Sequence, residues 1–84
     1  MATNRQVGDR IGLSHSSVSR IRAGERIPSV DVMVVIEREY GWTLADQVTA
    51  RAQQMADPAS QAYVLAFEQA VGAEDAEATQ PAAR

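Results

Sequence analysis

The chain has 84 residues, 45% of them hydrophobic, and a formal charge of −3 at pH 7. This length supports one small core, which excludes a two-domain enzyme with an interdomain cleft. The absence of Cys excludes disulfides, thiolate zinc sites and cysteine nucleophiles, the absence of Lys excludes Schiff-base chemistry, and His15 is the single imidazole. We therefore expect no enzyme activity, no catalytic residue, no metal site and no cofactor.

Two short helices, over 4–11 and 15–23, are predicted at the N-terminus. Each has an N-cap residue before it and a glycine after it: Thr3 and Gly12 for the first helix, Ser14 and Gly24 for the second. Gln6 completes a capping box in the first helix. Each helix has about two turns and is too short to be stable alone, so both must pack against a further element.

A third helix is predicted over 30–40. Ser29 can cap its start and Gly41 can end it. Residues 30–36 are rich in β-branched side chains and would also fit a strand. The caps at both ends and the length between them favour the helix.

A fourth helix is predicted to follow Thr43, with Asp46 in position to close a capping box. Its apolar residues recur at helical spacing and predict the side that faces the core. They are Leu44, Val48, Ala52 and Met55.

A fifth helix is predicted to begin at Asp57-Pro58 and to end at Gly72. Its apolar residues follow the clearest helical periodicity in the chain. The largest of them are Tyr63, Phe67 and Val71. Residues 73–84 have no periodicity and no large apolar side chain, so they are expected to be a disordered acidic tail. The fold class is therefore all-α, a small bundle of about five short helices.

Residues 3–23 have the spacing of a helix-turn-helix motif. Gly8 is small where the two helices would cross, and Gly12 fits the turn. With Val18 and Ile21 turned inward, the second helix leaves short polar side chains and an arginine facing outward. They are His15, Ser16, Ser17, Ser19 and Arg20, and such groups suit base edges and phosphates.

The stretch over 3–47 resembles the Cro and lambda-repressor type of helix-turn-helix DNA-binding domain. The matching residues occur in the family's order: Thr3, Val7-Gly8, Gly12, Val18-Ser19, Gly24, Pro28-Ser29 and Gly41-Trp42-Thr43-Leu44. The resemblance implies that residues 14–23 form the recognition helix. It implies base contacts from His15, Ser16, Ser17 and Arg20, and phosphate contacts from Arg22 and Arg26. It also implies that Asn4, where the family has Gln, contacts both a phosphate and a side chain of the recognition helix.

The family has a helix of about fifteen residues before the position of Thr3, whereas this chain has two residues there. We expect the helix within 57–72 to replace it. Tyr63, Phe67 and Val71 would either complete the core of their own chain or form the seam of a dimer. The predicted organisation is thus a DNA-binding domain over 1–56, a core-completing or dimerising helix over 57–72, and the tail over 73–84.

The charge is unevenly distributed. Residues 1–26 carry five Arg and two acidic residues, a net charge of +3, while residues 27–84 have a net charge of −6. The basic part can meet a polyanion while the acidic part keeps the protein soluble. The predicted function is a sequence-specific transcriptional regulator, of phage type or a bacterial repressor, that binds a double-stranded DNA operator as a homodimer.

An alternative function is an antitoxin or anti-repressor, in which the C-terminal half binds another protein. No membrane partner is expected, because the longest apolar run, 32–36, is far shorter than the roughly 20 residues needed to cross a bilayer. The expected location is the cytoplasm.

Overall fold

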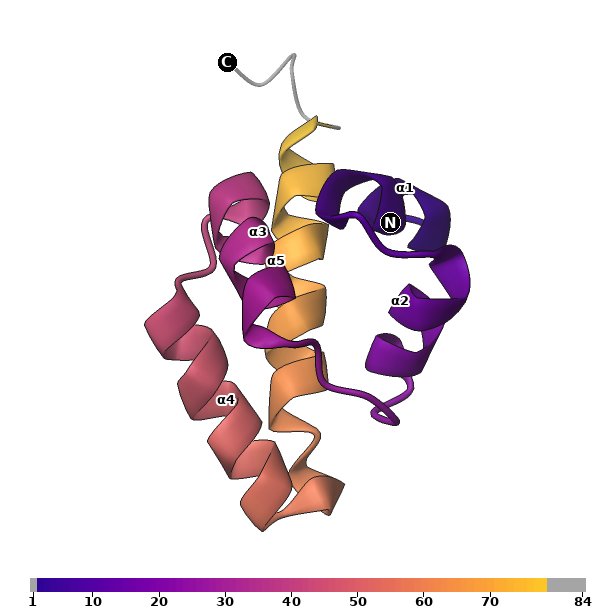
Figure 1. Cartoon of the computed structure of the whole chain (residues 1–84). Helices are drawn as coiled ribbons and strands as arrows, with labels where there is room; N and C mark the ends of the chain where they lie inside the picture. The colour runs from indigo at the N-terminus through magenta and orange to yellow at the C-terminus, as the bar shows by residue number, and fades with distance from the viewer. Residues whose placement is uncertain (1, 79–84) are drawn as a thin grey trace.

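The computed structural model describes residues 2–78, with side chains as far as Gly72. Within these residues there are five α-helices, one 3-10 turn and no strand. In chain order they are α1 (Asn4–Ile11), α2 (His15–Arg22), α3 (Val30–Tyr40), α4 (Leu44–Ala56), η1 (Pro58–Ser60) and α5 (Ala62–Ala78). In the view of Figure 1, α1 and α2 lie to one side of α5, and α3 and α4 to the other. The all-α prediction is confirmed, and the β-branched stretch of α3 is helical.

The predicted N-caps account for the starts of the first four helices. Thr3, Ser14, Ser29 and Thr43 each accept a hydrogen bond from the backbone N–H three residues later. The capping box of α1 is complete, because the Gln6 side chain accepts from the N–H of Thr3 at 2.9 Å. In α4 the second bond of a capping box, from the N–H of Thr43 to the Asp46 carboxylate, is not among the bonds of the described residues. Glu37 of α3 contributes there instead, and its carboxylate accepts from the N–H of Leu44 at 3.2 Å.

The predicted bounds of the fifth helix are wrong at both ends. Pro58 begins a single 3-10 turn, and Gln61 then adopts a left-handed conformation with φ of 49°. The long helix α5 begins only at Ala62, where the Gln54 side chain of α4 accepts from the N–H groups of Tyr63 and Val64. This cap comes from another helix, so a local pattern could not reveal it. The backbone of α5 also continues past Gly72 to Ala78, and of the predicted tail, residues 79–84 lie outside the described residues.

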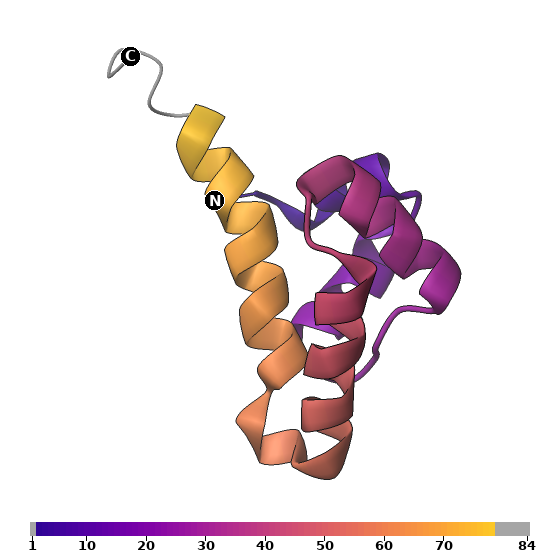
Figure 2. The same cartoon turned by 90° about the vertical axis from the view of Figure 1, so that its left-hand side faces the viewer.

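The core draws on all five helices, and α5 supplies its largest side chains. The buried apolar residues of the core cluster are Val7, Ile11, Val18, Ile21, Met33, Ile36, Ala50, Tyr63, Phe67 and Val71. The ring of half-buried Trp42 lies 4.8 Å from that of Tyr63. Figure 2 shows α5 alongside α4. Helix α5 also contacts α2 and α3. In this structure α5 therefore completes the core of its own chain. None of the described helices is long and apolar enough to span a membrane.

The predicted inner side of α4 is correct only at Leu44, which packs against the core, and is wrong for the other three residues, of which Ala52 is exposed. Val48 and Met55 are 43% and 63% exposed, whereas Gln47, Ala50 and Gln54 are buried. Gln47 faces inward because its amide is fully used there. Its Nε2 donates to the carbonyl oxygens of Met33 and Trp42 at 2.8 and 2.9 Å, and its Oε1 accepts from the Tyr63 hydroxyl at 3.0 Å. A hydrophobicity pattern assigns glutamines to the surface, and it therefore predicts that the wrong side of α4 faces the core.

Burial of the Tyr63 hydroxyl predicts a loss of stability in alkali. Desolvation raises the pKa of Tyr63 above its ordinary value of 10.0. The unfolded chain therefore loses this proton at lower pH than the folded chain, so the free energy of unfolding should fall above pH 10 by about 1.4 kcal/mol per pH unit. Urea unfolding between pH 8 and about 11.5 measures the slope. In a Tyr63→Phe variant the free energy of unfolding should fall clearly less steeply with pH. An equally steep fall would contradict the assignment of this effect to Tyr63.

Candidate nucleic-acid interface

Helix α2 buries one side and leaves the other open to solvent. Val18 and Ile21 are completely buried on its inner side. The exposed residues are His15, Ser16, Ser19 and Arg20, all of them predicted site residues. The described residues offer no hydrogen bond or ion pair to the guanidinium of Arg20, so it is available to a ligand. The outer side of α2 is thus a polar surface with one long cationic side chain.

The turn before α2 sets the crossing of the two helices. Gly12 adopts φ of 77°, a left-handed conformation that favours glycine. Gly8 is buried where α1 meets this turn, and a Cβ atom on it would collide with the carbonyl oxygen of Leu13. These two glycines let α1 and α2 approach closely enough for their short apolar sides to share one core.

The first turn of α2 is held by hydroxyl groups. Ser14 Oγ accepts from the N–H of Ser17 at 3.2 Å and donates to Ser17 Oγ at 3.1 Å. Nη1 of Arg26, from the loop after α2, also donates to Ser17 Oγ at 3.2 Å. Ser17 is half-buried and its hydroxyl is partly committed to the fold. Ser16 beside it is exposed, although its hydroxyl also lies in hydrogen-bond contact with Ser14 Oγ at 3.2 Å. Arg26 is brought next to the N-terminal end of α2, where the exposed side chains begin.

Arg22 and Asn4 are joined to each other and to α5. Nη1 of Arg22 donates to Oδ1 of Asn4 at 2.6 Å, and Nη2 donates to Oε1 of Glu68 at 3.1 Å. Nε of Arg22 lies 3.0 Å from Oε2 of Glu68, an ion-pair distance without hydrogen-bond geometry. The Arg22 side chain is only 14% exposed. It was predicted to face a phosphate, and the structure turns it toward α5 because Glu68 lies there.

The sequence analysis did not identify Glu68 as a support of α2. It is 46 residues from Arg22 in the chain, and only the packing of α5 against α2 brings the two together. The periodicity that predicted an apolar stripe on α5 gave no signal for an ion pair beside it.

The charges of the N-terminal region divide into paired and outward-facing groups. Arg10 donates to the backbone oxygen of Glu39 at 2.9 Å, and its guanidinium stacks over the ring of Tyr40 at 4.6 Å. Arg22 is paired with Glu68. The exposed arginines around α1 and α2 that remain for a polyanion are Arg5, Arg20 and Arg26. Across the part of the chain that the structure describes, no group of three acidic, His or Cys side chains could hold a metal ion.

Comparison with known families agrees with this geometry. The model of the helix-turn-helix family matches residues 3–47, which is more than half of the chain and covers α1 to the start of α4. No curated protein and no solved structure is significantly similar to the chain. The matched family is one of DNA-binding domains of transcription regulators. The chain belongs to the Cro and lambda-repressor type of helix-turn-helix family.

Proposed function

We propose that this chain is a sequence-specific repressor, of phage type or bacterial, that inserts α2 into the major groove of an operator and blocks transcription by occupying it. The observation that carries the proposal is the polar outer side of α2, on which Arg20 is exposed while Val18 and Ile21 fix the helix from behind. An arginine fork matches O6 and N7 of guanine. Two copies would read half-sites about 34 Å apart, one helical turn of DNA.

The neighbouring side chains take different parts in this proposal. His15, Ser16 and Ser19 are exposed beside Arg20 and would reach base edges or the adjoining phosphates. Arg26, held at the first turn of α2, would contact a phosphate.

Asn4 would also bind a phosphate. Because Arg22 only donates hydrogen bonds, it holds Asn4 through Oδ1 and leaves the Nδ2 hydrogens for an acceptor outside the protein.

The proposal predicts different losses for two arginines. Arg20→Ala should cost about 1–3 kcal/mol on the preferred DNA sequence, with a smaller loss on random DNA. Arg26→Ala should weaken binding on all sequences and reduce the salt dependence by about one phosphate contact. Fluorescence anisotropy at several salt concentrations measures both effects.

A matched control removes the same charge elsewhere. Arg38 on α3 is 69% exposed, and among the described residues its one ion pair is with its neighbour Glu39 at 3.6 Å. Arg38→Ala should leave affinity and salt slope close to those of the unchanged protein. Equal losses on specific and random DNA for Arg20→Ala would reject the base-reading role.

A further inference from the structure

Glu68 connects α5 to the end of α2 through Arg22. Nη2 of Arg22 donates to Oε1 of Glu68 at 3.1 Å, and Nε of Arg22 lies 3.0 Å from Oε2. Both oxygens of the carboxylate thus face the same edge of the guanidinium. The Arg22 side chain is only 14% exposed, so solvent and salt screen this ion pair less than one on the open surface. Glu68 therefore holds the guanidinium of Arg22 in one orientation.

The remaining nitrogen of the Arg22 guanidinium sets the orientation of the half-buried Asn4 side chain. Nη1 donates to Oδ1 of Asn4 at 2.6 Å. A guanidinium has no acceptor atom, so the oxygen is the only group of the Asn4 amide that it can bond. The Nδ2 group is then directed away from Arg22, and it has no hydrogen bond within the described part of the chain. Asn4 thus offers two N–H donors, which suit the oxygens of a phosphate.

We propose that Glu68 is a positioning residue for DNA binding, which fixes Arg22 and through it presents the Nδ2 donors of Asn4 to a phosphate. Glu68 itself lies on α5 and acts without contacting the DNA. The inference rests on the proposed function, because it takes Asn4 as a phosphate contact. It gives α5 a second role, in which the helix that completes the core also orients a side chain of the candidate DNA-binding surface.

Two other roles of Glu68 would give different results when its carboxylate is removed. If the ion pair only stabilised the fold, Glu68→Ala would lower the free energy of unfolding and leave the salt dependence of DNA binding unchanged. If Glu68 only kept Arg22 away from the DNA, Glu68→Ala would release a cation and raise the affinity. A positioning role predicts instead a lower affinity together with a smaller salt dependence.

Fluorescence anisotropy on a random-sequence duplex at several salt concentrations measures these effects in the full chain. Asn4→Ala and Glu68→Ala should each weaken binding by about threefold to tenfold, the worth of one hydrogen bond, and reduce the salt slope by about one phosphate contact. Because both changes remove the same contact, Glu68→Ala should weaken binding no further in an Asn4→Ala chain. Additive losses, or a Glu68→Ala chain that binds as tightly as the unchanged protein, would overturn the proposal.

Reversing the ion pair tests the orientation of the Asn4 amide itself. The double variant Arg22→Glu with Glu68→Arg can form the pair again, so its urea midpoint should stay close to that of the unchanged protein. A carboxylate at position 22 only accepts hydrogen bonds, so it should bond Nδ2 of Asn4 and leave Oδ1 facing the phosphate. A further Asn4→Ala change in this double variant should therefore cost no affinity. A loss as large as in the unchanged chain would overturn the proposal.

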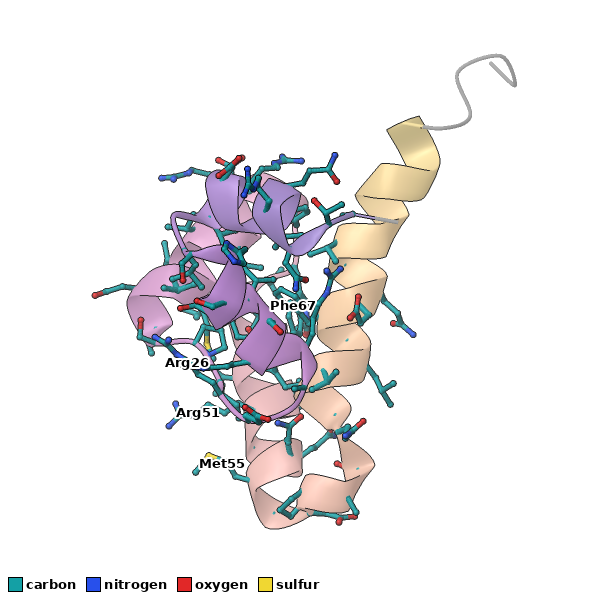
Figure 3. All side chains as sticks on the ribbon, turned by 90° about the vertical axis from the view of Figure 1, so that its right-hand side faces the viewer. Arg26, Arg51, Met55 and Phe67 are labelled. Carbon is teal, nitrogen blue, oxygen red and sulfur yellow. The ribbon has the colours of Figure 1, made fainter. Side chains whose placement is uncertain are left out.

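The matched control is Glu39→Ala, which breaks another ion pair to an arginine of the N-terminal region. Glu39 lies 3.3 Å from Arg10, at the other end of α1 from Asn4. Glu39→Ala should leave the salt slope unchanged. Arg26 provides a second control, because Figure 3 shows it projecting on the side of the molecule away from α5. The loss from Arg26→Ala should therefore add to the loss from Glu68→Ala.

The outcomes distinguish the failure of this inference from the failure of the proposed function. An unchanged chain that binds no DNA would reject the proposed function, and the positioning role of Glu68 with it. If the chain binds DNA but Asn4→Ala keeps the full salt slope, Asn4 makes no phosphate contact and the inference is overturned. If Asn4→Ala reduces the slope while Glu68→Ala does not, the phosphate contact stands and only the positioning role is rejected.

Discussion

Phe67→Ala should unfold a large fraction of the protein and remove DNA binding with it. The Phe67 ring is completely buried and lies 6.3 and 6.5 Å from the rings of Tyr63 and Trp42. Removing a buried phenylalanine costs about 3–5 kcal/mol. A domain of this length has only about 4–13 kcal/mol of stability in total, at roughly 0.05–0.15 kcal/mol per residue. Urea unfolding followed by circular dichroism measures the change.

The control for Phe67→Ala is Leu65→Ala on the same helix. Leu65 is 59% exposed, and a surface substitution of this kind should change the free energy of unfolding by no more than about 0.5 kcal/mol. DNA binding should then survive in Leu65→Ala and not in Phe67→Ala. If Phe67→Ala stayed within about 1 kcal/mol of the unchanged protein, α5 would not complete the core of the helix-turn-helix domain.

Gln47→Leu should be nearly as destabilising, although it makes a buried residue more hydrophobic. Gln47 is completely buried and makes hydrogen bonds to Met33, Trp42 and Tyr63. Leucine keeps most of the volume but leaves the Trp42 carbonyl and the Tyr63 hydroxyl without this partner. Each buried group left unpaired costs about 1–3 kcal/mol, so we expect a total loss of about 2–5 kcal/mol.

Gln53→Leu is the matched control for Gln47→Leu. Gln53 lies on the exposed side of α4, and its side chain makes no hydrogen bond among those of the described residues. The same substitution there should leave the urea midpoint almost unchanged. A Gln47→Leu variant as stable as Gln53→Leu would show that the buried amide does not hold α3, α4 and α5 together.

Local signals predicted the first three helices well. The hydroxyl caps at Thr3, Ser14 and Ser29 act within one turn of the chain, and glycines follow the helices at Gly12 and Gly41. Such contacts depend only on neighbours in sequence. The spacing of these elements was enough to indicate a helix-turn-helix, and the family match agrees with it.

Contacts between distant residues account for what the sequence did not predict. Gln54 caps a helix that begins eight residues later, and Gln47 is buried because three separate groups use its amide. Both glutamines occupy buried positions where hydrophobic periodicity expects apolar residues. The periodicity therefore predicted the wrong side of α4 as the buried one. The family resemblance assigned Arg22 to a phosphate, and nothing near it in sequence indicated its ion pair with Glu68.

Fewer of the N-terminal arginines face solvent unpaired in the fold than the sequence suggests. Two of the arginines in the basic N-terminal part, Arg10 and Arg22, form ion pairs with acidic residues of α3 and α5. The outward positive charge is thus concentrated at Arg5, Arg20 and Arg26, around the exposed side of α2. Acidic residues of α3 and α5 thus neutralise two of the five N-terminal arginines.

Selection of bound duplexes from a random DNA pool is the most direct test of base reading by α2. The unchanged chain should enrich a two-fold symmetric sequence containing guanine in each half-site. The Arg20→Ala variant should enrich the same sequence with that position relaxed in both halves. Failure of the unchanged chain to enrich any sequence, or an identical consensus from Arg20→Ala, would contradict the role of α2 as the recognition helix.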